Sequence, residues 1–232
     1  MVQQKPKTRT YRARTKHDTK KVPIELVPYN KKQGEYLDAL KSSSQIVVFG
    51  PAGTGKTYCV STFAANQYHT KRVSKIVITR PHVAVGKDVG YLPGTLEEKC
   101  APWALPVIDV LEKHLSKGTV ETGIKNGNIE VAPLALMRGR SFENSFVICD
   151  ESQNITFHEL KMLVTRIGEG SSLVMNGDIQ QSDLIKGVGL SKLVHLIKKH
   201  MLPVPIVEFT TEEIVRSGMT KLWVETFIKE GL

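Results

Sequence analysis

The eight residues 50–57, reading GPAGTGKT, constrain the fold of this chain more than any other segment. They follow a short apolar run, residues 46–49, and precede a segment with helical spacing. A strand, a glycine-rich loop and a helix in this order are typical of a phosphate-binding loop, whose backbone N–H groups face the phosphates of a nucleotide. The sequence therefore predicts an ATP site that comprises Gly50, Pro51, Ala52, Gly53, Thr54, Gly55, Lys56 and Thr57.

Individual side chains in and beyond this loop have expected roles. We expect Lys56 to reach the β- and γ-phosphates, and the Thr57 hydroxyl to bind Mg²⁺. A second apolar run, residues 146–149, ends in Asp150 and Glu151, which is a Walker B pattern. Asp150 would hold Mg²⁺ through a water, and Glu151 would orient and deprotonate the attacking water. Alone, such a pair is more often a turn or a helix cap, but its combination with the phosphate loop favours the catalytic interpretation.

Polar residues also follow a third apolar run, residues 173–175. Open α/β sheets bind ligands at the carboxyl ends of their strands, so these side chains should face the nucleotide. Gln181 or Asn176 could sense the γ-phosphate, or the segment could be an ordinary polar turn. The local sequence leaves both alternatives open.

Apolar runs that alternate with helical patterns predict a single α/β domain. The expected strands are 46–49, 76–79, 129–131, 146–149, 173–175 and 206–209, and the expected helices are 30–40, 58–68, 104–115, 156–166 and 190–199. Strands that are apolar on both faces indicate a mainly parallel sheet with helices on both sides. We therefore expect a RecA-like P-loop NTPase domain over residues 23–232, preceded by a basic flexible tail over residues 1–22.

The tail stands out by its charge. The chain carries a formal net charge of +9, and residues 1–21 contain eight lysines and arginines against the single acid Asp18. A basic segment with few apolar residues cannot offset its ordering entropy by burial, so we expect a flexible arm. It could tether the protein to RNA or DNA phosphates, or it could be a solvated tail that aids solubility.

Other features of the composition exclude several classes of protein. The three cysteines, Cys59, Cys100 and Cys149, are widely spaced and partly inside apolar runs, which predicts buried thiols instead of disulfides or a zinc site. No apolar run approaches the roughly 20 residues that cross a bilayer, and the first thirty residues lack the apolar core of a signal peptide. We therefore expect a cytoplasmic protein with no membrane partner.

Further motifs accompany the phosphate loop and the acidic pair. They are Thr79-Arg80-Pro81, GYLPG at residues 90–94, PLALMRGR at residues 133–140, the segment from Gly177-Asp178 to Gln181, and Val215-Arg216. Together these motifs resemble the PhoH family, ATPases of bacteria and phages related to the superfamily 1 helicases, over roughly residues 24–229. The chain departs from the family pattern at Met175-Asn176, where many members have Val-Thr.

The resemblance implies roles for residues that spacing alone leaves undecided. Gln33 resembles the glutamine that reads the adenine edge, although it could be a surface helix residue. Gln181 matches the glutamine that senses the γ-phosphate. Arg80 resembles a position near the nucleic-acid backbone, with a structural salt bridge as the alternative. Arg138 and Arg140 resemble part of a family motif, and we expect them to contact phosphate or nucleic acid.

The resemblance also implies an assembly. Related helicases complete the ATP site with an arginine from a second core domain, and the chain is too short to hold one. We expect Arg216 to act as an arginine finger supplied by a neighbouring subunit, in a head-to-tail ring that the resemblance implies is a hexamer. The expected activity is Mg²⁺-dependent ATP hydrolysis coupled to movement along RNA or single-stranded DNA, which could include unwinding. The sequence shows no separate carboxylate cluster for a nuclease. The alternatives are an AAA+-like protein-remodelling ATPase, a small-molecule kinase and a non-hydrolysing nucleotide switch.

Overall fold

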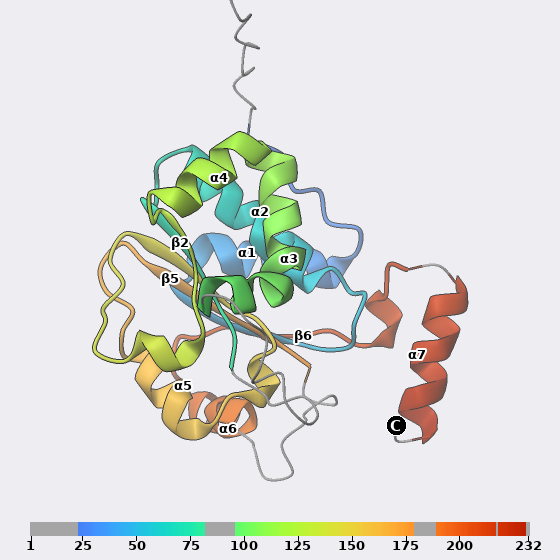
Figure 1. The fold of residues 1–232 in the computed structure, drawn as a ribbon. Coiled ribbons are helices and arrows are strands. Elements are labelled where there is room, and N and C mark those ends of the chain that lie inside the picture. The colour runs from blue at the N-terminus through green and yellow to red at the C-terminus, as the bar shows by residue number, and fades with distance from the viewer. Residues whose placement is uncertain (1–22, 82–95, 179–188, 217, 231–232) are drawn as a thin grey trace, which may run out of the picture.

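The described part of the chain forms a six-stranded sheet in which every paired strand is parallel (Figure 1). The structure is a computed structural model that describes residues 23–81, 96–178, 189–216 and 218–230. The strands are β1 (Gln45–Phe49), β2 (Lys75–Thr79), β3 (Ile129–Val131), β4 (Ser145–Cys149), β5 (Ser172–Gly177) and β6 (Ile206–Glu208). Their order is β3-β2-β4-β5-β1-β6. The RecA-like α/β fold expected from the sequence is confirmed.

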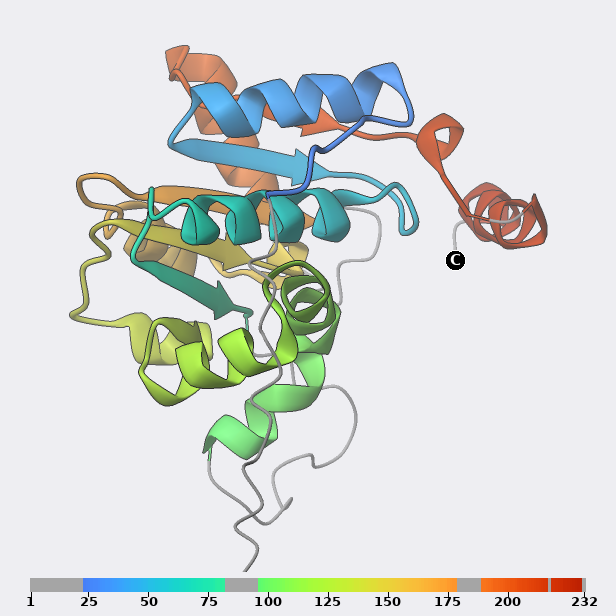
Figure 2. The ribbon, with the colours of Figure 1, turned by 90° about the horizontal axis from the view of Figure 1, so that it is seen from above.

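Helices cover both faces of this sheet, as the views in Figures 1 and 2 show. On one face lie α1 (Lys31–Ser42), α2 (Lys56–His69), α3 (Leu96–Leu115) and α4 (Lys117–Lys125), and on the other lie α5 (Phe157–Val164) and α6 (Gly189–His200). Successive side chains of a strand point to opposite faces. In β1, accordingly, Ile46 and Val48 belong to the first core while Val47 and Phe49 belong to the second. Strands buried on both sides explain why the sequence shows continuous apolar runs.

The helices differ from expectation in three places. Helix α3 begins at Leu96, before the expected residue 104, and contains Pro102 and Pro106, which hide its helical pattern. Helix α4 was not expected, because its short sequence KGTVETGIK carries two glycines; it is started by Ser116, whose hydroxyl accepts from the N–H of Thr119. Helix α7 (Gly218–Glu230) was also not expected. Each of the expected strands is present to within about two residues.

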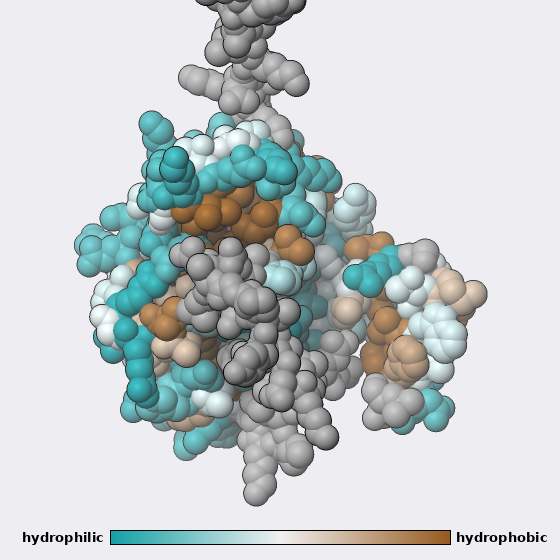
Figure 3. Space-filling model, viewed as in Figure 1, coloured by the Kyte–Doolittle hydropathy of each residue, from teal (hydrophilic) through white to brown (hydrophobic). Residues whose placement is uncertain are grey.

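Helix α7 stands away from the rest of the described chain (Figures 1 and 2). It contacts the short 3₁₀ turn η4 (Thr211–Glu213), and none of its described residues is buried. Four large apolar side chains on it are exposed: Met219, Leu222, Trp223 and Phe227. Figure 3 shows apolar surface on this helix. Helix α7 therefore presents an apolar face that no described residue covers.

Two smaller expectations can be compared with the structure. Cys59 and Cys149 are buried free thiols, as expected, whereas the side chain of Cys100 lies outside the description. Burial raises the pKa of Cys59 to about 11, which keeps this thiol protonated at neutral pH. Among the described residues no helix is both long and apolar enough to cross a membrane.

The sheet order determines where functional residues meet. Strand β5 lies between β1, which leads into the glycine-rich loop, and β4, which ends before Asp150. Because all three strands are parallel, their carboxyl ends lie at the same edge of the sheet. Residues that are more than a hundred positions apart in sequence come together at that edge.

Candidate nucleotide site

A cavity of about 440 Å³ lies at the carboxyl ends of β1, β4 and β5. This volume is in the range of small-molecule and cofactor sites, roughly 300–1,000 Å³. Its walls include parts of the glycine-rich loop and the start of α2, the two acids after β4, the end of β5, and Val215 with Arg216. Four motifs that the sequence singled out separately therefore share one cavity.

The glycine-rich loop has backbone conformations and contacts that exclude other residues. Gly50 has φ +140°, and a Cβ there would lie 2.3 Å from the carbonyl oxygen of Phe209. Gly53 has φ +86°, and a Cβ there would lie 2.9 Å from Cδ of Arg216. Such positive φ angles are strained for residues with a Cβ. The loop is thus fixed between its own strand and the segment that follows β6.

The Lys56 side chain is buried and folded back onto the loop. Its Nζ donates to the carbonyl oxygens of Gly50 at 2.6 Å and Pro51 at 2.8 Å. Burial lowers the pKa of Lys56, while the nearby carboxylates of the cavity oppose that shift. The partners of the ammonium group within the described residues are neutral oxygens, including the Thr54 hydroxyl at 3.4 Å, so phosphate oxygens could replace them with a gain in Coulomb energy.

Asp150 and Thr57 are bridged by one side chain from β5. The amide nitrogen Nδ2 of Asn176 donates to Oδ1 of Asp150 at 2.8 Å and to the hydroxyl of Thr57 at 2.9 Å. Burial raises the pKa of Asp150 to about 6, and the charge of the adjacent Glu151 adds to the rise. The backbone hydrogen bond from Glu151, the charge of Arg80 and the hydrogen bond from Asn176 oppose it. A buried carboxylate without a paired cation is a suitable ligand for a metal ion.

The residues around Asp150 fit a magnesium ion. Mg²⁺ takes oxygen ligands and keeps several of its waters. The Thr57 hydroxyl and the Asp150 carboxylate are close enough to share one amide group, and the buried oxygen Oδ1 of Asn176 has no hydrogen-bond partner among the described residues. Two oxygen atoms, from Thr57 and Asp150, thus lie close enough together to hold one ion, and the Asn176 amide beside them has an acceptor that no described donor uses.

Glu151 is held by a residue whose role the sequence did not reveal. Its carboxylate accepts from Nε2 of Gln153 at 2.6 Å, and Oε1 of Gln153 accepts from the backbone N–H of Asp178 at 2.9 Å. Gln153 lies in the 3₁₀ turn η2 (Ser152–Asn154) and is buried. It therefore joins Glu151 to the end of β5. A spacing of two residues gave no signal for this contact, because it depends on the turn and on the pairing of β4 with β5.

Gln33 lies against the loop but not in the cavity wall. Asn30 caps helix α1 by accepting from the N–H of Gln33 at 2.8 Å. The Gln33 side chain donates to the carbonyl oxygen of Thr54 at 3.0 Å and accepts from the N–H of Tyr29 at 2.9 Å. Gln33 is buried, so it is not the surface residue that we considered as an alternative. It ties α1 to the loop, and its contact with adenine stays a prediction.

Arg216 lies beside the loop of its own chain. The N–H of Val215 donates to the carbonyl oxygen of Gly53 at 3.0 Å, and the Arg216 side chain lies across Gly53 and lines the cavity. This placement arises because β6 pairs directly with β1, so the residues after β6 pass the loop that follows β1. The role of Arg216 as an arginine finger for a neighbouring subunit stays a prediction.

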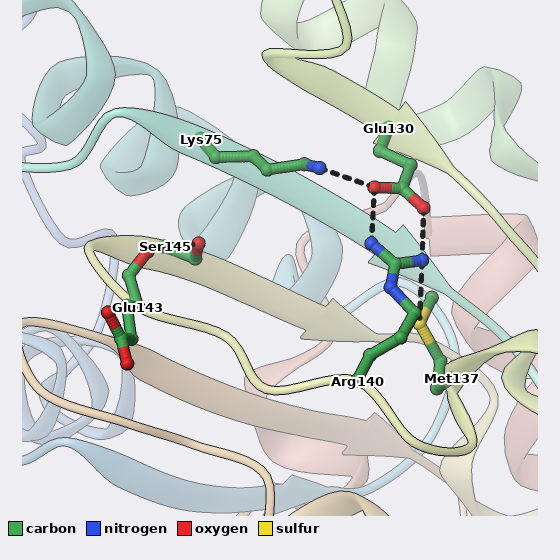
Figure 4. Close-up of polar contacts among 6 residues, drawn as sticks. All are labelled: Lys75, Glu130, Met137, Arg140, Glu143 and Ser145. Carbon is green, nitrogen blue, oxygen red and sulfur yellow. Dashed lines mark hydrogen bonds and ion pairs between the residues drawn. The ribbon is translucent and has the colours of Figure 1, made fainter.

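The remaining expected residues are distributed around the sheet. Arg80 follows β2, is half-buried, and its charge acts on Asp150. Arg138 is exposed and contacts His158 at 3.0 Å. Arg140 makes a two-pronged ion pair with Glu130, at 2.5 and 2.8 Å (Figure 4). Nucleic-acid contact by these arginines stays a prediction. Gln181 lies outside the described residues.

Glu130 also accepts from Lys75, with 2.6 Å between Nζ and Oε2 (Figure 4). We call Lys75, Glu130 and Arg140 the edge cluster, because they lie at the end of the sheet formed by β2 and β3. The hydrogen bond from Arg140, with that from Lys75, lowers the pKa of Glu130 to about 2. The charge of Arg140 is therefore already paired within the chain.

Comparisons with known proteins identify relatives over most of the chain. The family model described as PhoH-like protein matches residues 25–228. Protein PhoH of Escherichia coli (strain K12) is 42% identical over 194 residues, which cover 82% of this chain and 54% of that protein. The PhoH-like protein of Bacillus subtilis (strain 168) is 38% identical over 201 residues, which cover 86% of this chain and 63% of that protein. The chain thus spans little more than half the length of these curated relatives.

Solved structures with a similar arrangement of elements are more distant. The SWI2/SNF2 ATPase core of Sulfolobus solfataricus in complex with dsDNA has a TM-score of 0.46 and 14% identity, and covers 82% of this chain and 46% of its own. The Pif1 helicase from Candida albicans has a TM-score of 0.42 and 16% identity. The match covers 80% of this chain and 40% of the helicase chain.

Proposed function

This chain belongs to the PhoH-like protein family, and from that premise we propose that it is a magnesium-dependent ATPase. The observation that carries the proposal is the bridge from Asn176 to Thr57 and Asp150, which unites the phosphate loop and the acidic pair at one cavity. A P-loop alone indicates nucleotide binding. A P-loop beside a metal-ligating acid and a second carboxylate indicates hydrolysis.

Binding uses the loop and its two oxygen ligands. The N–H groups of the loop and the start of α2 receive the phosphates, and Lys56 exchanges the carbonyls of Gly50 and Pro51 for phosphate oxygens. Thr57 and Asp150 would hold Mg²⁺, which would supply positive charge to neutralise the phosphates. Gln33 would place the adenine by holding the loop to α1.

Hydrolysis requires a base and a positive charge near the γ-phosphate. Glu151 accepts a proton from the attacking water, and Gln153 fixes the direction of its carboxylate. Arg216, which lies across Gly53, would stabilise the charge that develops on the γ-phosphate. Gln181 would sense the γ-phosphate. It follows Asp178 by three residues, and the Asp178 backbone is itself bound to Gln153.

The direct test is hydrolysis by Glu151→Gln, with the exposed Glu143→Gln as the control. Loss of the general base should lower kcat by about 10²–10⁴-fold while ATP affinity is retained, and Glu143→Gln should behave as the parent. A parent protein that binds ATP but never releases phosphate would instead identify a nucleotide switch, and the ATPase proposal would fail.

A second part of the proposal concerns the partner. Residues 1–21 concentrate most of the net positive charge, which favours a polyanion, and we assign RNA or single-stranded DNA as the strand along which the ATPase moves in the cytoplasm. ATPase rate and binding should be measured with RNA and DNA oligonucleotides at several salt concentrations. Stimulation with a steep salt dependence is expected. If oligonucleotides neither stimulate the ATPase nor bind in a salt-sensitive way, nucleic acid is not the track. A protein-remodelling ATPase would give that result.

Assembly into a hexameric ring is the third part. A head-to-tail contact joins two different surfaces. One candidate is the apolar face of α7, and the other is the exposed pair Tyr58, which lines the cavity, and Leu105, which precedes the cavity residue Pro106. We assign a second copy of this chain as the partner of α7. Trp223→Glu should lower the mass in solution, while Lys229→Glu on the same helix should not. An unchanged mass for Trp223→Glu would exclude α7 from the contact.

The placement of Arg216 changes what a ring would do for catalysis. If Arg216 serves its own chain, mixing inactive Arg216→Ala with inactive Lys56→Ala restores no hydrolysis, because neither protein holds a complete site. If Arg216 serves a neighbour, a Lys56→Ala subunit supplies the missing arginine and activity returns. We expect no recovery, on the basis of the contact between Arg216 and Gly53.

A further inference from the structure

The Asn176 side chain lies where the two proposed metal ligands meet. It belongs to β5, beside Val48 of β1, and is 1% exposed. Both of its bridging bonds come from one atom: Nδ2 donates to the Thr57 hydroxyl at 2.9 Å and to Asp150 Oδ1 at 2.8 Å. Its oxygen Oδ1 is buried and finds no donor among the described residues. One end of the amide is fully used and the other is unused.

The chemistry of Asp150 determines which end of the amide faces it. An ionised carboxylate only accepts hydrogen bonds, so the NH₂ end of Asn176 must point toward Asp150. The opposite orientation would bring two acceptor oxygens together without a hydrogen between them. The amide orientation therefore follows from its partners, and the unused oxygen is a real consequence of it.

A buried acceptor without a donor is uncommon in folded proteins and calls for a physical reason. Here the same amide points two partly positive hydrogens at the oxygens that would receive a cation. Mg²⁺ is bound by oxygen atoms and its bound waters donate hydrogen bonds. The NH₂ group suits the metal-free site, whereas the Oδ1 atom suits the metal-bound site.

We infer that Asn176 is a metal-responsive amide of the nucleotide site. Without the ion, its NH₂ group holds Thr57 and Asp150 together. When Mg²⁺ binds, the amide turns about its terminal bond and Oδ1 accepts from a water of the ion. This inference rests on the proposed function, because it requires Mg²⁺ at Thr57 and Asp150. It assigns to β5 a positioning residue that links metal binding to the strand that leads into Asp178.

Side-chain amide resonances of the full chain test this turn directly. The ¹⁵N-labelled NH₂ group of Asn176 is identified by its loss in Asn176→Ala. It is then followed in EDTA alone, with a non-hydrolysable ATP analogue in EDTA, and with the analogue and Mg²⁺. We expect two protected hydrogens in both metal-free states, and an upfield shift with loss of exchange protection after Mg²⁺ is added. Unchanged resonances in the Mg²⁺-bound protein would overturn the inference.

Metal affinity gives a second readout that does not depend on turnover. Asn176→Ala removes the oxygen that receives a metal-bound water, so Mg²⁺ affinity in the presence of the analogue should fall about tenfold, as for other residues that contact a metal's ligands. Asn126→Ala, at an exposed asparagine outside the cavity, is the matched control and should bind Mg²⁺ as the parent does. Equal affinity in Asn176→Ala and the control would also overturn the inference.

The same titrations separate this inference from the proposed function. If the parent binds neither the analogue nor Mg²⁺, the ATPase proposal fails and the inference fails with it. If the parent binds both and the Asn176 resonances stay fixed, only the inference fails. If Asn176→Ala does not fold, through-bond correlation of the NH₂ group to the Asn176 backbone identifies the resonance in the unaltered chain, so the resonance measurement remains decisive.

Discussion

Two carboxylates of this chain, Asp150 in the cavity and Glu130 in the edge cluster, are shifted in opposite directions by their surroundings. The pKa of Asp150 is raised to about 6, chiefly by burial, and that of Glu130 is lowered to about 2, chiefly by the hydrogen bond from Arg140. Asp150 accepts a hydrogen bond from the neutral amide of Asn176, whereas Glu130 lies between two cations. Among the described residues Asp150 therefore has no salt-bridge partner, whereas Glu130 has two.

The comparison explains why charge alone does not mark a functional site. Arg140 lies in a motif that resembles a segment of the family, yet both terminal nitrogens of its guanidinium donate to Glu130. Lys56 is more deeply buried than Arg140. Its partners among the described residues are the carbonyl oxygens of Gly50 and Pro51 and the Thr54 hydroxyl, none of which is charged. A buried charge with neutral partners can bind an ion from solution, while a paired charge mainly contributes to stability.

The largest effect should come from removing one lysine from each region. Lys56→Ala should lower ATP hydrolysis by at least about 10²-fold, because the γ-phosphate loses its nearest cation in a buried site. Lys75→Ala should leave the rate within about twofold, since Lys75 contacts Glu130 and not the cavity. Steady-state phosphate release measures both. Equal losses from the two variants would remove the distinction between the regions.

Two glycines with positive φ provide the next comparison. Gly53→Ala should lower kcat/KM by up to about 10²-fold. The added methyl group would lie 2.9 Å from Cδ of Arg216, so the Arg216 side chain must move away from its position in the cavity wall. Gly139→Ala introduces the same backbone strain at φ +75°, but a Cβ there meets nothing within 4 Å. It should cost about 1 kcal/mol of stability and leave kcat/KM near the parent value. A loss of activity in Gly139→Ala of similar size would show that strain, and not Arg216, is the cause.

The raised pKa of Asp150 predicts a pH dependence of metal binding. Mg²⁺ requires the ionised carboxylate, so Mg²⁺ affinity measured with an ATP analogue should fall roughly tenfold per pH unit below about pH 6. Analogue binding in EDTA should lack this step. A flat Mg²⁺ affinity between pH 7 and pH 5 would contradict the assignment of Asp150.

The same shift acts on stability with the opposite sign. The pKa of Asp150 is higher in the folded chain than its ordinary value of 3.8, so the folded state takes up the proton more readily. Asp150 therefore favours the metal-free folded state fully below about pH 4, and this contribution is lost as the pH rises through about 6. Glu130 behaves in reverse, because its lowered pKa favours folding above its usual range and loses that effect as the pH falls toward about 2.

The smallest effect should come from the edge cluster. Arg140→Ala should lower the free energy of unfolding by about 1 kcal/mol, since the pair with Glu130 is partly exposed and Lys75 remains as a partner. This corresponds to a fall in Tm of about 2–4 °C, measurable by thermal unfolding. The ATPase rate should not change. A reduced salt dependence of oligonucleotide binding in Arg140→Ala would show instead that Arg140 reaches a nucleic-acid phosphate.

The sequence predicted the sheet well because its strands are buried on both faces. A run such as residues 46–49 is apolar at every position, which leaves little doubt about its burial. Helices α4 and α7 were not predicted, since α4 is short and rich in glycine and α7 has no buried residues that would give a strong periodic pattern. Helix α3 was predicted to begin at residue 104 and not at Leu96, because Pro102 and Pro106 are unusual inside a helix.

The site was predictable only where a motif contains its own geometry. The loop around Lys56 and the acids after β4 could be recognised because each role follows from local spacing. The bridge from Asn176 to Thr57 joins residues 119 positions apart, and the position of Arg216 depends on the pairing of β6 with β1. Neither follows from spacing, because each requires the order of strands in the sheet.

The strand order also has a consequence for how the chain folds as it is synthesised. Strand β1 is among the first elements made, but both of its partners, β5 and β6, are encoded in the last third of the chain. Until residue 172 has left the ribosome, β1 and the loop that follows it have no strand to pair with, and their apolar side chains stay exposed. Such late, long-range pairing slows folding. The nascent chain should therefore need protection by a chaperone longest at its nucleotide-binding segment.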